Sequence, residues 1–392
     1  MQNLSYVIAT PHTIAKSRTG GVVSRLLSRT DLELIGAQIF APDNEFCKEY
    51  ADSLRVRAPQ NQLMLLADYI ENVVAPGKGR PHRTLLLLFR GENPCEQLLD
   101  ACGHIYPQNV EIDAMHGESI RDTYADMIFS KDNPEEIYYF EPAVLTPRRQ
   151  DDADGDLKLL AKLLEGKPNI VRNITYPDES VIEHSLVIIK PDNWNHGSGR
   201  PGSVLDMFSR TGLRIIGTKI FRFTLNQALD FYGSVEGNLM RKLAPSIGQK
   251  AREVLEKEFE VYLNRETELA LIESFGREYA REQFTKVVEF MSGKRPDTCP
   301  AGDEDKPGEV KCMIVLYEGI NAIQKIRDVL GPTDPLQAPG GTIRREFGSS
   351  VMINTAHASD SVESSKREQE IVQINQNSLV SIINEHFASY GN

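Results

Sequence analysis

The sequence predicts an α+β protein made of two ferredoxin-like α/β sandwiches. In each, helices cover an antiparallel sheet, and the second sandwich carries a helical insertion. The composition is that of a globular protein, with 40% hydrophobic and 26% charged residues among 392. It excludes wholesale disorder and indicates two to three domains of about 150 residues each. The chain also repeats itself, and each repeat alternates strand and helix patterns in β-α-β-β-α-β order.

The repeat is visible as three pairs of similar segments in the same order. The segments SRTDLELIGAQIF at 28–40 and SRTGLRIIGTKIF at 209–221 are identical at eight of thirteen positions. Such self-similarity over long distances indicates a tandem duplication. The other two pairs are LLLLFRGEN at 85–93 with MIVLYEGIN at 313–321, and SIRDTY at 119–124 with TIRREF at 342–347.

These markers divide the chain into three predicted parts. Residues 1–145 form a first copy, and residues 181–392 form a second copy. Residues 146–180 link them and contain a short amphipathic helix near Leu157–Leu164. The offset between matching segments grows by 47 residues after the first marker, so the second copy carries an insertion at about 233–310 with helical patterns.

Within the second copy, hydrophobic periodicity predicts the order of strands and helices. The predicted elements are a strand at His184–Lys190, a helix at Ser203–Thr211, a strand at Arg214–Phe223, helices including 282–291, a strand at Lys311–Tyr317, a helix at Asn321–Leu330, a helical turn at Ile343–Phe347, a strand near Val351–Thr355 and a final helix from about Ser361.

Charge and cysteine content exclude several functional classes. With 44 basic and 56 acidic residues the net charge is −12, which makes general binding to nucleic acid a poor expectation. Five cysteines without a CxxC pair argue against a disulfide framework or a zinc site and favour a reducing compartment. The longest apolar run, Leu85–Phe89, is too short to cross a membrane, and the amino terminus lacks a signal-peptide pattern. We therefore expect a cytoplasmic protein without membrane contacts.

One histidine stands out as a candidate nucleophile. His357 follows a strand pattern, and Asp360 then begins a helix as its expected N-cap, with Glu363 three residues on. A carboxylate that accepts one ring N–H fixes the tautomer and leaves the other nitrogen able to attack an electrophile. The first turn of the helix also presents N–H groups to an anion. The plainer interpretation is an ordinary histidine at the end of a strand.

Cations and hydroxyls in the flanking segments favour the chemical interpretation. Together they suit a triphosphate, whose charge must be neutralised before a nucleophile approaches it. The alternative for each is a solvated surface charge. The residues concerned are Lys190, Arg327, Thr333, Arg344 and Asn354.

At this point the second copy resembles the nucleoside diphosphate kinase family. The resemblance covers about residues 184–375 and rests on VIIKPD, GLRIIGTKIF, MIVLYEG, LGPTDP, GTIRREF and NTAHASDSVES, in the family's order. The run Asn-x-x-His-Ala-Ser-Asp-Ser after a GTIR turn is close to diagnostic of that family.

The resemblance implies a role for each matching residue. His357 resembles the histidine that takes the γ-phosphoryl group from a nucleoside triphosphate and passes it to a diphosphate in a ping-pong reaction. Glu368 matches the carboxylate that orients its imidazole, and Ser359 the neighbouring hydroxyl. Mg²⁺ bridging the phosphates is implied by the family's chemistry, with no protein ligand evident. The nucleotide-binding residues implied in this way are Lys190, Tyr232, Arg281, Arg327, Thr333, Arg344 and Asn354.

The second copy also departs from the family's pattern. Alignment from FMSG at 290–293 places Arg281 on a phosphate-binding arginine and Gln283 where the family carries an aromatic that stacks on the base. Stacking on a base is worth about 1–3 kcal/mol in nucleic-acid complexes. Its loss predicts weaker nucleotide binding unless Phe284 or a residue of the insertion replaces it.

The first copy has lost the residues of the site. Thr10 stands where Lys190 stands, Leu99 matches Arg327, and no histidine follows Arg121 at the expected place. We therefore expect the first copy to be catalytically inactive and to serve a structural or partner-binding role. A lone arginine such as Arg121 is more often a surface charge.

A glycine motif at the start of one predicted helix is set aside. Gly197, Gly199 and Gly202 satisfy G-x-G-x-x-G, the dinucleotide-binding pattern. The motif begins seven residues after the strand and contains Pro201, so a flexible loop is the better interpretation.

Two functions follow from the sequence. The first is a nucleoside diphosphate kinase acting on nucleoside tri- and diphosphates, supported by His357, Glu368 and the phosphate donors. The second is a nucleotide-binding regulatory or scaffold protein with little turnover, suggested by Gln283, the insertion and the inactive first copy. Because family members assemble, the resemblance also implies a homo-oligomer.

Overall fold

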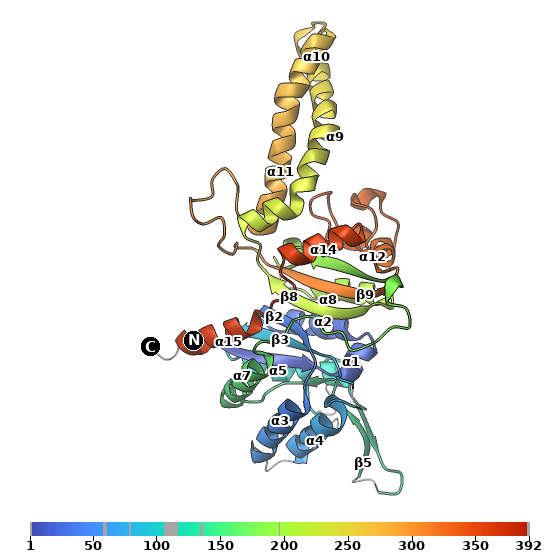
Figure 1. Cartoon of the computed structure of the whole chain (residues 1–392), viewed down its shortest axis with the longest axis vertical. Helices are drawn as coiled ribbons and strands as arrows, with labels where there is room; N and C mark the ends of the chain where they lie inside the picture. Colours follow the sequence, from blue (N-terminus) through green and yellow to red (C-terminus); the bar gives the residue numbers. More distant parts are fainter. Residues whose placement is uncertain are drawn as a thin grey trace. The chain divides into compact units, whose positions relative to one another are not determined.

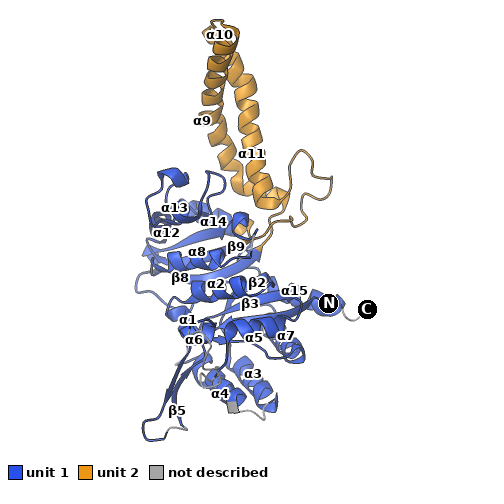
Figure 2. Ribbon diagram, turned by 180° about the vertical axis from the view of Figure 1, so that it is seen from behind, with its two compact units in different colours: residues 1–220, 313–369, 373–392 blue, residues 221–312, 370–372 orange. Residues whose placement is uncertain are grey.

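The computed structural model describes residues 2–57, 61–77, 80–105, 117–133, 136–195 and 197–389. It contains two compact units (Figure 2). The first comprises residues 1–220, 313–369 and 373–392, and the second comprises residues 221–312 and 370–372. Among the described residues, no helix is both long enough and apolar enough to span a membrane.

A four-stranded antiparallel sheet forms the centre of the first copy. Its strand order is β2-β3-β1-β6, with β1 paired along its length to β3 and at its end to β6. The strands are β1 (Asn3–Ala9), β2 (Glu33–Phe40), β3 (Thr84–Gly91) and β6 (Val144–Leu145), and β4 (Asp126–Phe129) pairs separately with β5 (Ile137–Glu141). The helices are α1 (Pro11–Ala15), α2 (Thr19–Arg29), α3 (Asn44–Arg57), α4 (Asn61–Tyr69), the π-helical turn Ile70–Val74, α5 (Pro94–Cys102), α6 (Ile120–Tyr124) and α7 (Gln150–Leu164).

A second sheet has the same order of corresponding strands. Its order β10-β7-β9-β8 equals that of the first sheet when β7, β8, β9 and β10 replace β1, β2, β3 and β6. The predicted pair of antiparallel sheets covered by helices is therefore confirmed, and the equal order is what a duplication predicts. The strands are β7 (Ile182–Ile189), β8 (Arg214–Phe221), β9 (Cys312–Ile320) and β10 (Ala356–Ala358). The helices are α8 (Arg200–Ser209), α12 (Ala322–Leu330), α13 (Ile343–Phe347), α14 (Val362–Ile371) and α15 (Leu379–Ser389), with 3₁₀ turns at Glu179–Val181, Pro191–Asn193 and Pro335–Gln337.

Alternation along β1 separates two apolar cores. Val7 and Ala9 face a core that continues into the second copy, and Tyr6 and Ile8 face a core on the other side of the first sheet. This period of two is the ordinary geometry of a strand buried on both faces. The predicted link between the copies contributes to the core that contains Tyr6 and Ile8, because Leu157 of α7 is fully buried in it.

Helix α2 of the first copy packs directly on α8 of the second (Figure 1). The contact is close because Gly20 and Gly202 face each other, and a Cβ on Gly202 would overlap the backbone of Ser24 and Gly20. Gly202 thus lies in a packed helix and not in the expected flexible loop. Small residues permit this approach because they leave the two backbones unobstructed.

The last helix returns to the first copy. Leu379 and Ile383 of α15 are buried in the same core as Leu157 and Leu160 of α7. The side chain of Asn377 donates a hydrogen bond of 3.0 Å to the carbonyl of Leu164, which fixes the start of α15 against the end of α7. The boundaries 1–145, 146–180 and 181–392 stay a prediction.

The second unit is a long helical hairpin. Helix α9 (Leu225–Phe259) is followed by α10 (Arg265–Leu271), a π-helical turn (Ile272–Gly276) and α11 (Arg277–Ser292), and α9 packs along α11 (Figure 2). Thr224 and Gln227 form a capping box at the start of α9. Gly276 and the backbone of Ala244 are in close contact, so the two arms approach without side chains between them.

One predicted strand is wrong. Residues Val351–Thr355 form bends, and the strand is Ala356–Ala358. Val351 and Ile353 are 58% and 40% exposed, so their apolar pattern does not mark a buried strand. The side chain of Asn354 instead holds the turn by donating to the carbonyls of Thr333 and Val351 at 3.0 and 2.8 Å.

The glycine contact between α2 and α8 gives the first prediction. Gly202→Leu should destabilise the protein by about 1–3 kcal/mol, because the new side chain forces two packed backbones apart. Chemical denaturation followed by circular dichroism measures the loss. Gly197→Ala is the control, since a Cβ there meets nothing within 4 Å. Equal stability of the two variants would contradict the close packing.

Candidate active site

Strand β10 sets the position of His357. It pairs with β7 so that His357 lies opposite Ile188, with Ala356 opposite Ile189. Just before the strand, Thr355 has a φ of 76°, an uncommon conformation for a residue with a Cβ. Its carbonyl accepts a hydrogen bond of 3.0 Å from the backbone N–H of Lys190. The turn at Thr355 therefore ties the histidine strand to the end of β7.

His357 and Glu368 form a hydrogen-bonded pair. Nε2 of the imidazole lies 2.9 Å from Oε1 of Glu368, whose side chain is nearly fully buried. The hydroxyl of Ser359 donates to Oε2 of the same carboxylate at 2.6 Å. This arrangement holds the ring in one orientation and directs Nδ1, the nitrogen that does not face Glu368, away from the carboxylate.

Helix α14 brings Glu368 to the histidine. The helix begins after Ser361, whose Oγ accepts a hydrogen bond of 3.0 Å from the N–H of Ser364. Ser361 therefore caps the helix, and the expected cap at Asp360 is wrong by one residue. The cap fixes the first turn of α14, and Glu368 lies on the buried side of the second.

Lys190 and Asn354 are joined directly. Nζ of Lys190 donates a hydrogen bond of 2.7 Å to Oδ1 of Asn354, and the amide of Asn354 bonds to the carbonyl of Thr333. Burial is the main cause that lowers the pKa of Lys190 to about 8, and the positive charge of Arg344 lowers it further. A cation held in this way gains from a nearby anion, since the anion restores the charged form.

Arg344 connects three segments of the site. Its guanidinium donates to the carbonyl of Gly331 at 2.9 Å and to the carbonyl of Ala356 at 3.1 Å. It therefore joins the turn after α12, helix α13 and the residue before His357. This geometry brings together seven of the predicted site residues, which are Lys190, Thr333, Arg344, Asn354, His357, Ser359 and Glu368.

The remaining predicted residues are placed differently. Arg327 lies exposed on α12. Tyr232 on α9 and Arg281 on α11 belong to the second unit, so their part in the site stays a prediction. Gln283 is half-buried. Phe284, the expected substitute for the stacking aromatic, is 6% exposed, so its ring is buried in the structure.

Sequence reasoning missed a brace behind the site. Arg200 donates to the hydroxyl of Thr355 at 3.1 Å and bonds to Asp192 at 3.2 Å. It also bonds to the carbonyl of Phe347. These three bonds of Arg200 hold the backbone of Thr355 in its unusual conformation. The sequence signal that could have indicated them was Asp192, the acidic residue at the end of the LVIIKPD segment.

The first copy preserves the framework of this site without its chemistry. Ala143 has a φ of 61° and its carbonyl accepts a bond from the N–H of Thr10, as Thr355 and Lys190 do in the second copy. The pairing of β6 with β1 then puts Leu145 opposite Ile8, the position that His357 takes opposite Ile188.

Arg121 is not a surface charge. It is 4% exposed and donates to the carbonyls of Gly103 and Val144, as Arg344 does to Gly331 and Ala356. The expectation of a surface role fails because the sequence around a single arginine does not reveal what packs over it.

Among the described residues, no group of three or more histidine, cysteine and acidic side chains is arranged to hold a metal ion. Mg²⁺ that is bound together with a nucleotide commonly keeps phosphate oxygens and water among its ligands. The donors at the site, Lys190, Arg344 and the N–H groups at the start of α14, suit phosphate oxygens.

Comparison with known proteins identifies relatives of this chain. A family model described as nucleoside diphosphate kinase matches residues 273–377. The nucleoside diphosphate kinase of Aquifex aeolicus is 30% identical over 190 residues, which are 48% of this chain and 91% of that protein. That of Staphylothermus marinus is 30% identical over 190 residues, 48% of this chain and 92% of that protein. The chain belongs to the nucleoside diphosphate kinase family.

Two solved structures of nucleoside diphosphate kinases align with about half of this chain. A crystal structure of the Aquifex aeolicus enzyme aligns with a TM-score of 0.32 and 27% identity, covering 50% of this chain and 97% of that chain. A crystal structure of an NDP kinase from Pyrobaculum aerophilum aligns with a TM-score of 0.33 and 23% identity, covering 48% of this chain and 94% of that chain.

The lowered pKa of Lys190 gives the second prediction. Affinity for ADP should fall as the pH rises from 7 to 9, because the ammonium loses its proton around pH 8 and a phosphate favours its charged form. Isothermal titration at several pH values measures the change. Lys190→Arg is the control, since a guanidinium stays charged across this range. An equal decline in both proteins would exclude Lys190 as the cause.

Proposed function

We propose that the second copy is a nucleoside diphosphate kinase that works by a ping-pong mechanism through phospho-His357. The observation that carries the proposal is the hydrogen bond of 2.9 Å between Nε2 of His357 and Glu368, with Ser359 bonded to the same carboxylate. In the first half-reaction Nδ1 attacks the γ-phosphorus of a nucleoside triphosphate. The bond from phosphorus to the bridging oxygen breaks, and the diphosphate leaves with the electron pair.

The second half-reaction reverses these events. A terminal phosphate oxygen of another nucleoside diphosphate attacks the phosphorus, and the bond to Nδ1 breaks to restore the imidazole. Glu368 stabilises the positive charge that the ring carries while it is phosphorylated, because its carboxylate faces Nε2. Charge and orientation supply most of the catalysis in such phosphoryl transfers.

The cations around His357 are proposed to neutralise the phosphates. Lys190 bonds to Asn354, Arg344 bonds to the carbonyl of Ala356, and the charge of Arg344 acts on Lys190. Arg327 and Thr333 are exposed. We assign Tyr232, Arg281 and Asn354 to the same binding role, Asn354 through its bond to Lys190. The substrate is proposed to be the Mg²⁺ complex of the nucleotide.

The first copy is proposed to be inactive in this reaction. Leu145 occupies the place of the histidine, and an aliphatic side chain has no lone pair to accept a phosphoryl group. Its proposed role is structural, through the contact of α2 with α8. We also propose that the chain forms a homo-oligomer, as the family resemblance implies.

A nucleotide-binding regulatory or scaffold protein is the second candidate. It is favoured by Gln283 at the expected stacking position, with Phe284 buried elsewhere. Weak stacking would lower affinity without removing the nucleophile, so the two candidates differ in whether His357 becomes phosphorylated.

Incubation with γ-labelled ATP gives the third prediction. The wild type should acquire a label that acid removes and base does not, because a phosphoramidate forms on His357. His357→Ala should lose it. His184→Ala is a matched control, since its Nε2 also bonds to a buried glutamate, Glu318, at 3.2 Å. No label in the wild type, or label retained in His357→Ala, would rule out the kinase.

The pair formed with Glu368 gives the fourth prediction. Glu368→Gln should slow formation of the phosphoenzyme by about 100-fold, because a neutral amide cannot stabilise the charged ring. Ser359→Ala should have a smaller effect, about tenfold or less, since it removes only one bond to the carboxylate. Quenched-flow labelling measures both rates.

Ser361→Ala serves as the control for these variants. It removes the cap of α14 and should cost about 1 kcal/mol of stability while leaving the labelling rate nearly unchanged. If Glu368→Gln labels as fast as this control, Glu368 does not orient the histidine.

A further inference from the structure

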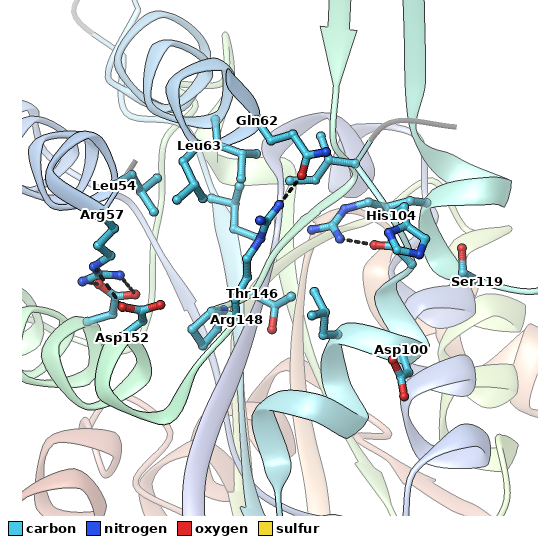
Figure 3. A pocket seen from close by; sticks show the side chains of 18 of the residues that line it. Leu54, Arg57, Gln62, Leu63, Asp100, His104, Ser119, Thr146, Arg148 and Asp152 are labelled. Carbon is cyan, nitrogen blue, oxygen red and sulfur yellow. Dashed lines mark hydrogen bonds and ion pairs between the residues drawn. The ribbon is translucent and has the colours of Figure 1, made fainter. Parts of the chain in front are cut away.

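A cavity of about 480 Å³ is lined by residues of the first copy and of the start of the link (Figure 3). Helices α3, α4, α5, α6 and α7 contribute to its wall, and Leu145 and Thr146 at the end of β6 also line it. Cavities of this size commonly hold small ligands. None of the residues assigned to the proposed active site is among those that line this cavity.

Arg121 is the buried cation of this cavity. It is 4% exposed, and its described hydrogen bonds go to two backbone carbonyls. Within the described residues no carboxylate forms an ion pair with Arg121, and its Nε is buried without a hydrogen-bond partner. Burial, followed by a repulsive charge from Arg148, lowers the pKa of Arg121. A buried guanidinium in this state is stabilised by an anion.

Arg148 is another of the four arginines that line the cavity, the remaining two being Arg29 and Arg57. Figure 3 shows its side chain directed to Gln62, and the structure gives a hydrogen bond to the neutral amide oxygen of that residue. Burial also lowers the pKa of Arg148. The positive charges of Arg121 and Arg148 therefore share one partly desolvated space.

The acidic residues of the cavity mostly face other cations or helix ends. Asp156 bonds to Arg57 at 2.7 Å, and Glu118 bonds to Arg29 at 2.6 Å. Of the other three, Asp152 pairs with Arg149, Asp122 caps α6, and Asp100 lies on α5. The negative charges described at the cavity are therefore largely committed, while the hydrogen bonds of Arg121 to described residues go to carbonyls.

Apolar side chains form part of the lining as well. Such side chains suit a planar ring, since small-molecule pockets are commonly lined by apolar side chains with a few placed polar groups. The apolar lining residues are Leu54, Leu63, Leu66, Leu99, Ile105 and Leu145.

We propose that a nucleoside diphosphate binds in this cavity, with its phosphates against Arg121 and Arg148 and its base against the apolar lining residues. The ligand is held without turnover, because Leu145 stands where the second copy has His357. The protein then has two nucleotide sites for each chain, of which one is catalytic. The existence of the second site does not depend on the reaction proposed for the first.

The test is calorimetric titration of the full chain with ADP. Arg148→Ala should weaken one class of ADP site by about 10- to 100-fold, the effect typical of losing a bond to a charged group. Arg149→Ala is the matched control, because this adjacent arginine is 70% exposed, pairs with Asp152 and does not line the cavity. It should bind ADP as the wild type does.

A second variant fills the cavity instead of removing charge. Leu63→Trp extends from a half-buried position on α4 and should abolish the same class of ADP site. Pyrophosphate should compete for this site more weakly than ADP, and adenosine should not compete. Unchanged ADP binding in both Arg148→Ala and Leu63→Trp would overturn the proposal.

Labelling with γ-labelled ATP separates this proposal from the proposed function. Arg148→Ala should label His357 at the wild-type rate, because the second copy is intact. If the wild type acquires no label and Arg148→Ala loses a class of ADP site, the kinase is contradicted and the nucleotide site in the cavity is supported. If labelling is normal and Arg148→Ala does not change ADP binding, the kinase is supported and the nucleotide site in the cavity is contradicted.

Discussion

The candidate site depends on the hydrogen bonds that the guanidinium of Arg344 donates. This group bonds to the carbonyls of Gly331 and Ala356, so it fixes the turn after α12 to the strand that carries His357. The same bonds recur around Arg121 in the first copy, where the nucleophile is missing. These arginine bonds are therefore a property of the fold that both copies share.

Much of the architecture could be predicted because the repeated segments coincide with strands and with the helices beside them. GLRIIGTKIF contains β8, MIVLYEGI is in β9, and GTIRREF contains α13. These segments carry local sequence patterns, namely alternating apolar and polar residues and turn residues, that can be recognised without knowledge of tertiary contacts. The pair of His357 and Glu368 was also predicted, though through the family resemblance and not through spacing alone.

What could not be predicted depends on contacts between distant residues. The pattern at Val351–Thr355 is apolar, yet Asn354 holds it as a turn through the distant carbonyl of Thr333. Nothing near Arg121 in the sequence indicates that it is buried, and an amphipathic helix such as α15 does not specify which sheet it covers. The cap at Ser361 and the close approach of Gly202 to Gly20 are likewise decided by packing.

The return of α15 to the first copy affects how the chain folds during its synthesis. The core that contains Leu157 and Leu160 also contains Leu379 and Ile383, which the ribosome adds more than two hundred residues later. At about 5–20 residues per second this is a delay of roughly 10 to 40 seconds. During that interval the nascent amino-terminal sandwich has an incompletely covered apolar face, a surface of the kind that molecular chaperones recognise.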